Sequence, residues 1–268
     1  MTRENANEAL VNAMQKHGNP AIAKATRLLV DAHRTRVPAA SAGVPLQSEE
    51  EAYRVQHAVF AELWPGARPA AWKAGGPSDK VEPTAAPIAP ERLLRSPASV
   101  QGAKMNMIGV EAEVAFRLAK DLPLRTRPYS ERAIAAAVGE VLVTIELCDT
   151  RLANWKETTG LWKLADFQNN SALVAGSGTK DWQKIDFLQQ KVEFRIGARV
   201  VNAQGAHSFG NPFRVLPWLV AHCHKRSMAL HAGDVITTGA WTGLEIAKAG
   251  DEVTAIFPGI GEATVRIN

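Results

Sequence analysis

Three glutamates interrupt apolar stretches in the middle of this chain. Glu111 and Glu113 stand two residues apart in the segment GVEAEVAF (109–116), so on a β-strand both project from the same face. Glu146 lies inside VLVTIELC (141–148), a β-branched and aliphatic run that is typical of a buried strand. A buried glutamate needs compensation, and facing carboxylates need either protonation or a cation. Mg²⁺ or Mn²⁺ suits this role, because hard divalent ions prefer carboxylate and water ligands.

A simpler interpretation stays open for the first pair. Alternating glutamates are common on the solvent face of an edge strand, where Glu111 and Glu113 would never meet Glu146. The apolar surroundings of Glu146 favour the metal site, since a carboxylate there has no evident partner.

Local patterns predict the elements that must position these side chains. Apolar stripes predict helices over 9–14 and 21–32, and Ser48 with Glu51 in capping-box spacing predicts a helix up to residue 63. A short strand is expected at 70–74. The Pro- and Ala-rich stretch 83–97 predicts an extended loop.

The second part of the chain has a different pattern. Helices are expected at 130–138 and 216–221, and alternating or β-branched runs predict strands at 105–118, 141–147, 192–196, 235–238, 252–257 and 263–267. We therefore expect an α+β fold in which residues 1–100 form a helical or α+β N-terminal part. Residues 101–268 form a strand-rich body that holds the site.

Composition excludes several classes of protein. The 268 residues are 46% hydrophobic and 22% charged, which are globular proportions, and the net charge of +4 is scattered, so no nucleic-acid partner is expected. No apolar run approaches 18 residues, and the N-terminus lacks the apolar core of an export signal. We therefore expect a cytoplasmic protein without a membrane partner and with two reduced thiols, Cys148 and Cys223. His222 and His224 flank Cys223, but their spacing on a helix is wrong for one metal ion.

Beyond these physical arguments, the sequence resembles the fumarylacetoacetate hydrolase superfamily. The resemblance rests on GVEAEVAF, on IELCDTR (145–151), and on AYRVQ (52–56), WKAG (72–75), NWK (154–156), GNP (210–212) and GDVITTG (233–239). More narrowly, the chain is similar to the branch of 2-keto-4-pentenoate hydratases and 2-oxo-3-hexenedioate decarboxylases. The similarity runs in order from about residue 45 to residue 268.

The resemblance implies a β-roll-like body and a metal-dependent enzyme that acts on small 2-oxo acids, usually as a homodimer or a multiple of dimers. It matches Glu111, Glu113 and Glu146 to the metal ligands and Lys73 to a lysine over the substrate. Hydratases commonly show Ala-Asp-Asn-Ala-Ser-Ser where this chain has ADFQNNS (165–171), a departure that bears on the substrate and the reaction.

The chemistry follows from the substrate class. A 2-oxo acid chelates a cation through its carboxylate and keto oxygens, and the cation stabilises the enolate. We expect a hydratase of a short 2-hydroxydienoate in aromatic-compound degradation, with a decarboxylase or C–C bond hydrolase of the same superfamily as alternative. A non-catalytic ligand-binding homo-oligomer is a remote alternative.

Other side chains are assigned around this chemistry. Lys73 and Asp166 are the candidate catalytic residues, and desolvation beside Trp72 is expected to lower the pKa of Lys73. Lys156, Thr238 and Gly239 are candidate substrate-binding residues, although a solvated helix face or a plain turn would also explain them. His207 and the other histidines receive no catalytic role.

Overall fold

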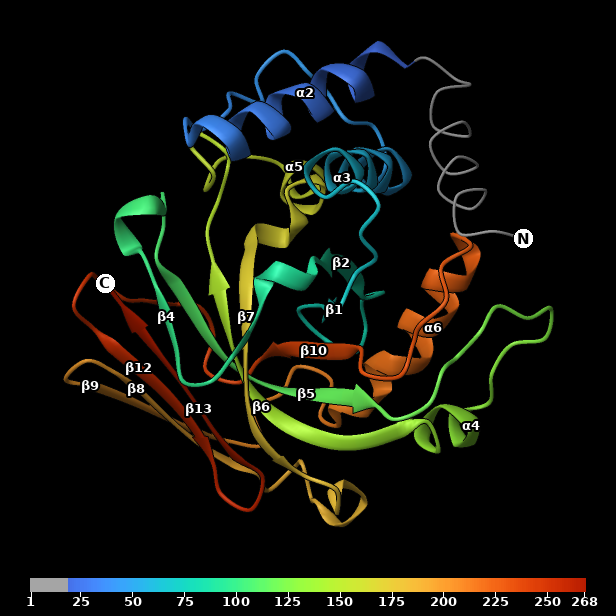
Figure 1. Cartoon of the computed structure of the whole chain (residues 1–268), viewed down its shortest axis with the longest axis vertical. Coiled ribbons are helices and arrows are strands. Elements are labelled where there is room, and N and C mark those ends of the chain that lie inside the picture. The colour runs from blue at the N-terminus through green and yellow to red at the C-terminus, as the bar shows by residue number, and fades with distance from the viewer. Residues whose placement is uncertain (1–18) are drawn as a thin grey trace.

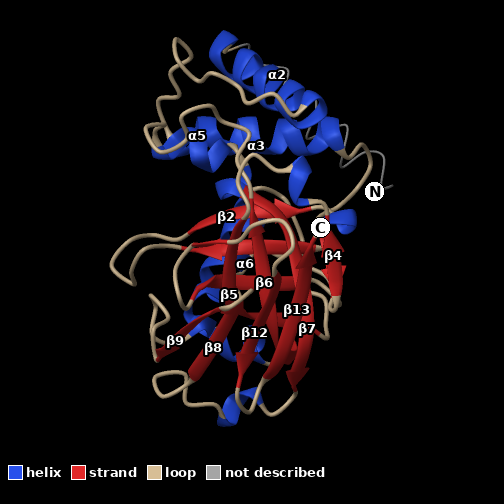
Figure 2. Cartoon of the chain, turned by 90° about the vertical axis from the view of Figure 1, so that its left-hand side faces the viewer, coloured by secondary structure: helices blue, strands red, loops and turns tan. Residues whose placement is uncertain are grey.

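Two β-sheets and a layer of helices make up the protein. The computed structural model describes residues 19–268, and the helix expected over 9–14 lies outside this range. The helices form one layer above the sheets (Figures 1 and 2), apart from α4 and α6, which lie beside the strands. The α-helices are α2 (Pro20–Thr35), α3 (Glu49–Leu63), α4 (Glu131–Ala135), α5 (Gly160–Ala165) and α6 (Val215–Lys225). Short 3-10 turns are η1 (Pro90–Arg92), η2 (Gly102–Lys104), η3 (Phe167–Asn169), η4 (Trp182–Lys184) and η5 (Pro212–Arg214).

The larger sheet has eight strands and holds the glutamates. Its strand order is β2-β1-β10-β5-β6-β7-β3, with β11 paired to β5. The strands are β1 (Ala71–Gly75), β2 (Thr84–Ile88), β3 (Leu93–Arg95), β5 (Gly109–Leu118), β6 (Val138–Cys148), β7 (Asn170–Thr179), β10 (Val235–Ala240) and β11 (Glu245–Ile246). The sheet therefore takes strands from both sides of residue 100.

A five-stranded sheet packs on one face of the larger sheet. Its order is β4-β13-β12-β8-β9, with β4 (Ala98–Val100), β8 (Lys191–Ile196), β9 (Arg199–Gln204), β12 (Glu252–Phe257) and β13 (Gly261–Ile267). Between the sheets lies the main hydrophobic core, which includes Phe116, Ile145, Phe194 and Phe257. Phe116 on β5 and Ile145 on β6 point to the face opposite the glutamates of their strands, so burial of one face directs Glu111, Glu113 and Glu146 to the other.

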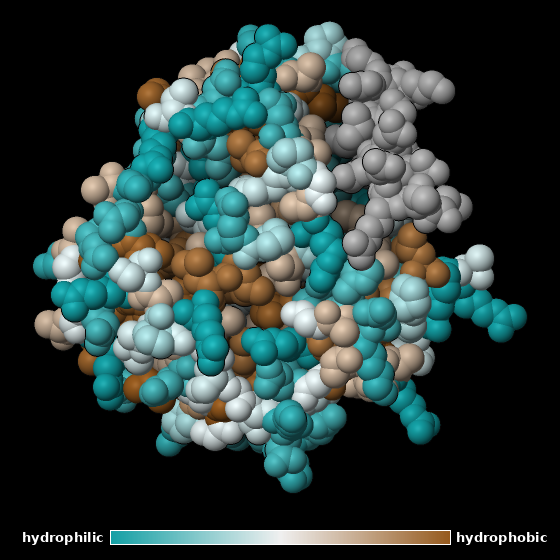
Figure 3. Space-filling view, viewed as in Figure 1, coloured by the Kyte–Doolittle hydropathy of each residue, from teal (hydrophilic) through white to brown (hydrophobic). Residues whose placement is uncertain are grey.

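The helical layer has a core of its own. Ser48 caps α3 through a 3.2 Å hydrogen bond from the Glu51 N–H to its hydroxyl, as the spacing predicted. Leu29, Tyr53 and Trp162 pack there with Ala86 of β2. Figure 3 shows hydrophilic side chains over most of one face, with a hydrophobic area in the hollow between the helical layer and the strands. Within residues 19–268, no helix has the length and apolar character needed to cross a membrane.

The prediction of an extended loop over 83–97 is wrong. This stretch contains β2, which pairs antiparallel with β1, and β3, which pairs parallel with β7. Pro87 is tolerated opposite Trp72 because β2 is an edge strand, where a missing N–H interrupts no ladder on the outer side. Strand β7 was also not predicted, since its sequence NSALVAGSGT is rich in Gly and Ser and lacks clear alternation.

Close packing of β7 on the second sheet gives a test of this architecture. A Cβ added to Gly176 would lie 2.0 Å from the carbonyl oxygen of Glu262 and 2.7 Å from the Cβ of Ala263. We expect Gly176→Ala to lower the free energy of unfolding by about 2 kcal/mol in urea denaturation, because backbone must move to relieve the overlap.

The matched control is Gly160→Ala at the start of α5, where an added Cβ would meet nothing within 4 Å. Its free energy of unfolding should stay within about 0.5 kcal/mol of the wild type. Equal stability of Gly176→Ala and the wild type would contradict the contact between β7 and β13.

Candidate active site

The three glutamates lie on one face of adjacent strands, as the sequence predicted. Glu111 on β5 is the direct cross-strand partner of Glu146 on β6, and Glu113 is the partner of Thr144. Glu113 and Glu146 have no exposed surface, and the side chain of Glu111 is 15% exposed. The alternative of a solvent-facing edge strand is wrong, because β5 is paired with β10 and β6.

Lys73 reaches the glutamates from β1. Its Nζ lies 2.9 Å from Oε1 of Glu146 and 3.6 Å from Oε2 of Glu111. Burial acts to lower the pKa of Lys73, but attraction to Glu146 and Glu111 outweighs it and raises this pKa well above its ordinary value. The expected lowering is therefore wrong. The charged ammonium neutralises part of the negative charge that a cation would otherwise balance.

Glu113 is held from the side of β10. Its Oε2 accepts hydrogen bonds from the Thr237 hydroxyl and, at 3.0 Å, from the Gly239 N–H. Burial, together with repulsion from Glu146 and Glu111, raises the pKa of Glu113 well above its usual value. Its second oxygen, Oε1, is buried and has no hydrogen-bond partner among residues 19–268, and the same holds for Oε2 of Glu146. Buried oxygens of this kind are costly unless a ligand satisfies them.

The donor set fits a divalent metal ion. Glu111, Glu146 and Cys148 each offer one ligand atom, and these atoms lie within 4.8 Å of one another. Glu113 is outside this set, but its unpaired Oε1 leaves one oxygen free to join. Carboxylates suit Mg²⁺ or Mn²⁺, and the thiol adds a softer donor. The sequence analysis did not predict Cys148 as a metal ligand, although Cys148 follows Glu146 by two residues and so lies on the same face of the strand.

Asp166 lies in a different polar network. Its carboxylate accepts hydrogen bonds from the backbone N–H of Arg151 at 2.9 Å and from the Arg151 Nε at 2.5 Å. Burial raises the pKa of Asp166, and the Arg151 guanidinium acts in the opposite direction. The structure thus places Asp166 with Arg151, and no contact among residues 19–268 joins its carboxylate to the glutamates. Its catalytic role stays a prediction.

The candidate substrate-binding residues are divided by the fold. Thr238 and Gly239 reach the glutamates at the end of β10. The Thr238 hydroxyl donates a hydrogen bond to the Val114 carbonyl at 2.7 Å, and the Gly239 N–H donates one to Glu113. Lys156 is exposed in a turn after β6, away from these contacts. The substrate-binding roles of all three stay predictions.

Several side chains around the glutamates were not found from the sequence. Asn170 donates a 3.0 Å hydrogen bond from Nδ2 to Oε1 of Glu146, and the Gln168 carbonyl lies 3.5 Å from the Lys73 Nζ. Both contacts depend on the η3 turn, where Phe167, Gln168 and Asn169 all have φ between 53° and 62°. Nothing in the local sequence predicts three successive left-handed residues without glycine.

A family model matches most of the chain. The family model described as fumarylacetoacetate (FAA) hydrolase C-terminal matches residues 52–268. The chain belongs to this family. The resemblance stated from the sequence motifs is confirmed, including the branch of hydratases and decarboxylases.

Individual relatives within the family are distant. The chain is 28% identical over 156 residues to 2-keto-4-pentenoate hydratase 1 of Dechloromonas aromatica, a region that covers 58% of each protein. It is 26% identical over 158 residues to 4-oxalocrotonate decarboxylase of Pseudomonas putida, covering 59% of each. The aligned region thus spans less than two thirds of these relatives.

A solved structure of the family shares the fold over nearly the whole chain. It is 4-oxalocrotonate decarboxylase from Pseudomonas putida G7, complexed with magnesium and adipate, with a TM-score of 0.81 and 20% identity. The match covers 94% of this chain and 99% of the other. The α+β, β-roll-like fold expected for the family is thereby confirmed.

His207 supports the end of strand β10, which carries Gly239. Its Nδ1 accepts the Phe209 N–H at 3.2 Å, so its Nε2 carries the proton donated to the Thr238 carbonyl at 2.9 Å. Burial lowers the pKa of His207 to about 4, against a weaker raising effect of the Thr238 bond. A charged ring would lose its bond from Phe209, because both nitrogens would then be donors.

This arrangement predicts acid sensitivity. A histidine whose pKa is lower in the folded state stabilises the fold above the unfolded pKa of 6.5, and this contribution is lost as the pH falls toward 4. The free energy of unfolding of the wild type should fall between pH 7 and pH 4.5. In His207→Gln this fall should be smaller by about 2 kcal/mol. The measurement is urea denaturation at each pH.

The control is His231→Gln, whose wild-type side chain is 43% exposed, and its pH profile should follow the wild type. If His207→Gln also followed the wild type, the neutral ring described here would be wrong.

Proposed function

We propose that this protein is a divalent-metal-dependent lyase that adds water to a short 2-hydroxydienoate or 2-oxo-enoate, such as 2-keto-4-pentenoate. The observation that carries the proposal is the buried cluster of Glu111, Glu113, Glu146 and Lys73, in which two carboxylate oxygens have no hydrogen-bond partner within the described chain. Glu111, Glu113 and Glu146 would hold the metal, Mg²⁺ or Mn²⁺. When bound, the metal would polarise the keto group of a 2-oxo acid as a Lewis acid.

The protein's own groups would then act on the substrate. Lys73 carries a positive charge at the cluster, so its ammonium would attract the substrate carboxylate or hold a proton for transfer to carbon. Gly239 and Thr237 fix Glu113, and Asn170 fixes Glu146, so the carboxylates are oriented before a ligand arrives. In hydration, water adds at carbon 4 of the unsaturated keto acid and a proton is delivered to carbon 3.

A decarboxylase is the second candidate. Its support is the fold match to 4-oxalocrotonate decarboxylase over 94% of the chain. In that reaction, the bond between carbons 5 and 6 of 2-oxo-3-hexenedioate breaks, carbon dioxide leaves, and the electron pair moves into the conjugated enolate. The same electron sink serves both reactions, so the glutamates do not distinguish them.

We further propose that the protein works in the cytoplasm as a homodimer or a multiple of dimers, in aromatic-compound degradation. The role in aromatic-compound degradation is supported by the relatives named as hydratases of short dienoates. The partner of the site is then a small 2-oxo acid rather than a nucleic acid or a membrane.

A substrate comparison tests the reaction. Purified protein with Mg²⁺ should consume 2-hydroxypenta-2,4-dienoate, which is measured as a loss of the ultraviolet absorbance of the dienoate. Mass spectrometry should identify the product as the 4-hydroxy-2-oxo acid. Release of carbon dioxide from 2-oxo-3-hexenedioate without turnover of the dienoate would establish the decarboxylase instead. Turnover of neither, with tight metal-dependent oxalate binding, would support a non-catalytic binding protein.

Substitution of Glu146 tests the metal site. Glu146→Gln keeps the side-chain volume but removes one charged oxygen, and we expect the Mn²⁺ dissociation constant by calorimetry to rise at least about tenfold. Chelation of the wild type should abolish turnover, and Mg²⁺ or Mn²⁺ should restore it.

Glu140→Gln is the matched control, because Glu140 lies on the same strand and pairs with Arg117 at 2.8 Å. It should keep wild-type Mn²⁺ affinity. Full affinity and turnover in Glu146→Gln would show that Glu146 is not a required ligand.

A further inference from the structure

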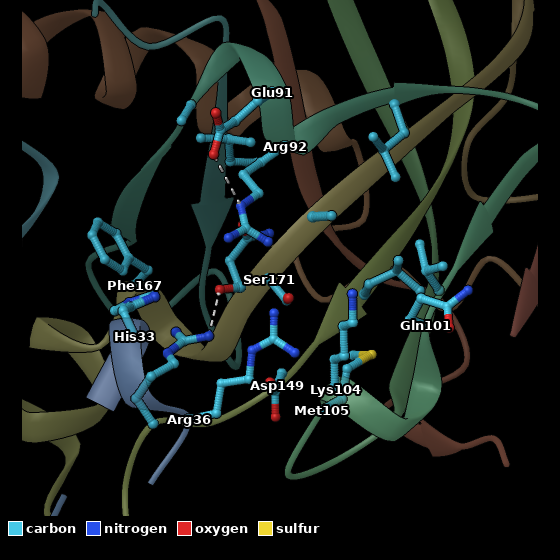
Figure 4. Close-up of a pocket in the computed structure, with 18 of the residues that line it drawn as sticks. His33, Arg36, Glu91, Arg92, Gln101, Lys104, Met105, Asp149, Phe167 and Ser171 are labelled. Carbon is cyan, nitrogen blue, oxygen red and sulfur yellow. Dashed lines mark hydrogen bonds and ion pairs between the residues drawn. The ribbon is translucent and has the colours of Figure 1, made fainter. Parts of the chain in front are cut away.

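A second polar site lies on the opposite side of β6 from the glutamates. It is a cavity of about 350 Å³ between the end of α2, η1, η2 and the start of β7 (Figure 4). Leu147 lines this cavity, whereas its neighbours Glu146 and Cys148 face the glutamate cluster. The cavity is therefore separate from the proposed metal site.

The walls of the cavity are rich in basic side chains. Arg36, Arg92, Lys104 and Arg151 all line it, and we call it the cationic pocket. Figure 4 shows Arg36, Arg92 and Lys104 on different sides of one space. Arg36 is the C-cap residue of α2, and its left-handed backbone (φ of 61°) ends the helix at the wall of the cavity.

The acidic side chains of the pocket do not balance this charge. The Oδ1 of Asp149 accepts three backbone N–H groups, from Asn106, Met107 and Thr150, at 2.8–2.9 Å. Glu91 accepts the Trp64 indole N–H at 2.7 Å and lies 3.9 Å from the Arg92 Nε. The pocket is thus lined by four basic side chains and only two carboxylates.

Two of the cations have no hydrogen-bond or ion-pair partner in the described part of the chain. Within residues 19–268, neither the Arg36 nor the Lys104 side chain forms an ion pair or a hydrogen bond. Arg151 is already committed to Asp166 and to the Asn170 carbonyl. A guanidinium and an ammonium are thus free to bind a ligand.

The cations also lie close enough to repel one another. Burial, with further contributions from Arg151 and Arg36, lowers the pKa of Arg92 despite the attraction of Glu91. Burial, then Arg151 and Arg92, lowers the pKa of His33 to about 2, so this ring is neutral. Its Nε2 is buried at the pocket wall and has no hydrogen-bond partner in residues 19–268. An anion would relieve the repulsion and supply partners to these groups.

We propose that the cationic pocket binds a small, multiply charged oxyanion, either a polycarboxylate or a phosphate group. The volume lies at the lower end of the range for ligand pockets, which suits a compact metabolite. Arginine forks recognise carboxylate and phosphate oxygens by paired hydrogen bonds, and Trp64 and Phe167 close the apolar side. The site is independent of the lyase activity and of the metal.

Calorimetry on the full-length protein tests the proposal. Metal is first removed on a chelating resin, since soluble chelators are themselves polyanions. Citrate and inorganic phosphate are then titrated separately at constant ionic strength, with acetate as the monoanion control. We expect saturable binding of at least one of the two, and the stronger one identifies the ligand class. Acetate should bind at least tenfold more weakly.

Variants locate the bound anion. Arg36→Gln and Lys104→Gln, both at exposed positions, should each weaken the bound polyanion at least about fivefold. Arg34→Gln is the matched control, because Arg34 lies two residues before Arg36 in the last turn of α2 but pairs with Glu62 at 3.4 Å, and it should keep wild-type affinity. Glu111→Gln should also keep it.

Three results would overturn the proposal. They are no saturable binding of either polyanion, wild-type affinity in both Arg36→Gln and Lys104→Gln, or equal weakening in Arg34→Gln. A change in Glu111→Gln alone would place the anion at Lys73 and would likewise contradict the cationic pocket. None of these outcomes depends on whether the protein turns over a 2-oxo acid.

Discussion

The burial of carboxylates inside a β-sheet is the constraint on which this structure depends. Glu113 and Glu146 have no exposed surface, and Glu111 is nearly buried beside them. Such charges are tolerated only when other groups compensate them, and the protein supplies part of that compensation through Lys73, Thr237, Asn170 and the Gly239 N–H. Two carboxylate oxygens remain without a hydrogen-bond partner in the part of the chain that the structure describes, and a divalent cation would coordinate them.

Strand order explains how this compensation is assembled. Lys73 is the parallel partner of Thr237 across β1 and β10, and β10 in turn lies beside β5. A lysine and a threonine from opposite ends of the chain thus reach the same sheet face as the glutamates. The second sheet buries the alternate residues of β5 and β6, so a shift by one residue would move the glutamates into the apolar core.

Strand β6 separates two environments of opposite charge. One face carries the glutamates, and beyond Leu147 lies the cationic pocket. Asn170 contacts both, because its side chain donates to Glu146 and its carbonyl accepts from Arg151. The left-handed η3 turn that presents Asn170 occupies the segment ADFQNNS, where this chain departs from the common hydratase pattern. The departure therefore lies in a segment that contacts both the glutamate cluster, through Glu146, and the cationic pocket, through Arg151.

Local sequence was sufficient for the features that depend on neighbouring residues. The two-residue spacing of Glu111 and Glu113 placed them on one strand face, the Ser48 cap began α3, and the apolar run around Glu146 indicated its burial. The charge of Lys73, the pairing of Asp166 with Arg151, the position of Cys148 near Glu111 and the strands β2, β3 and β7 emerged only from the tertiary structure. These features depend on cross-strand register and on contacts between residues far apart in the sequence, such as Lys73 and Glu146, which are 73 residues apart. A side chain's electrostatics are set by the charges that folding brings within a few ångströms, and spacing along the chain does not encode those distances.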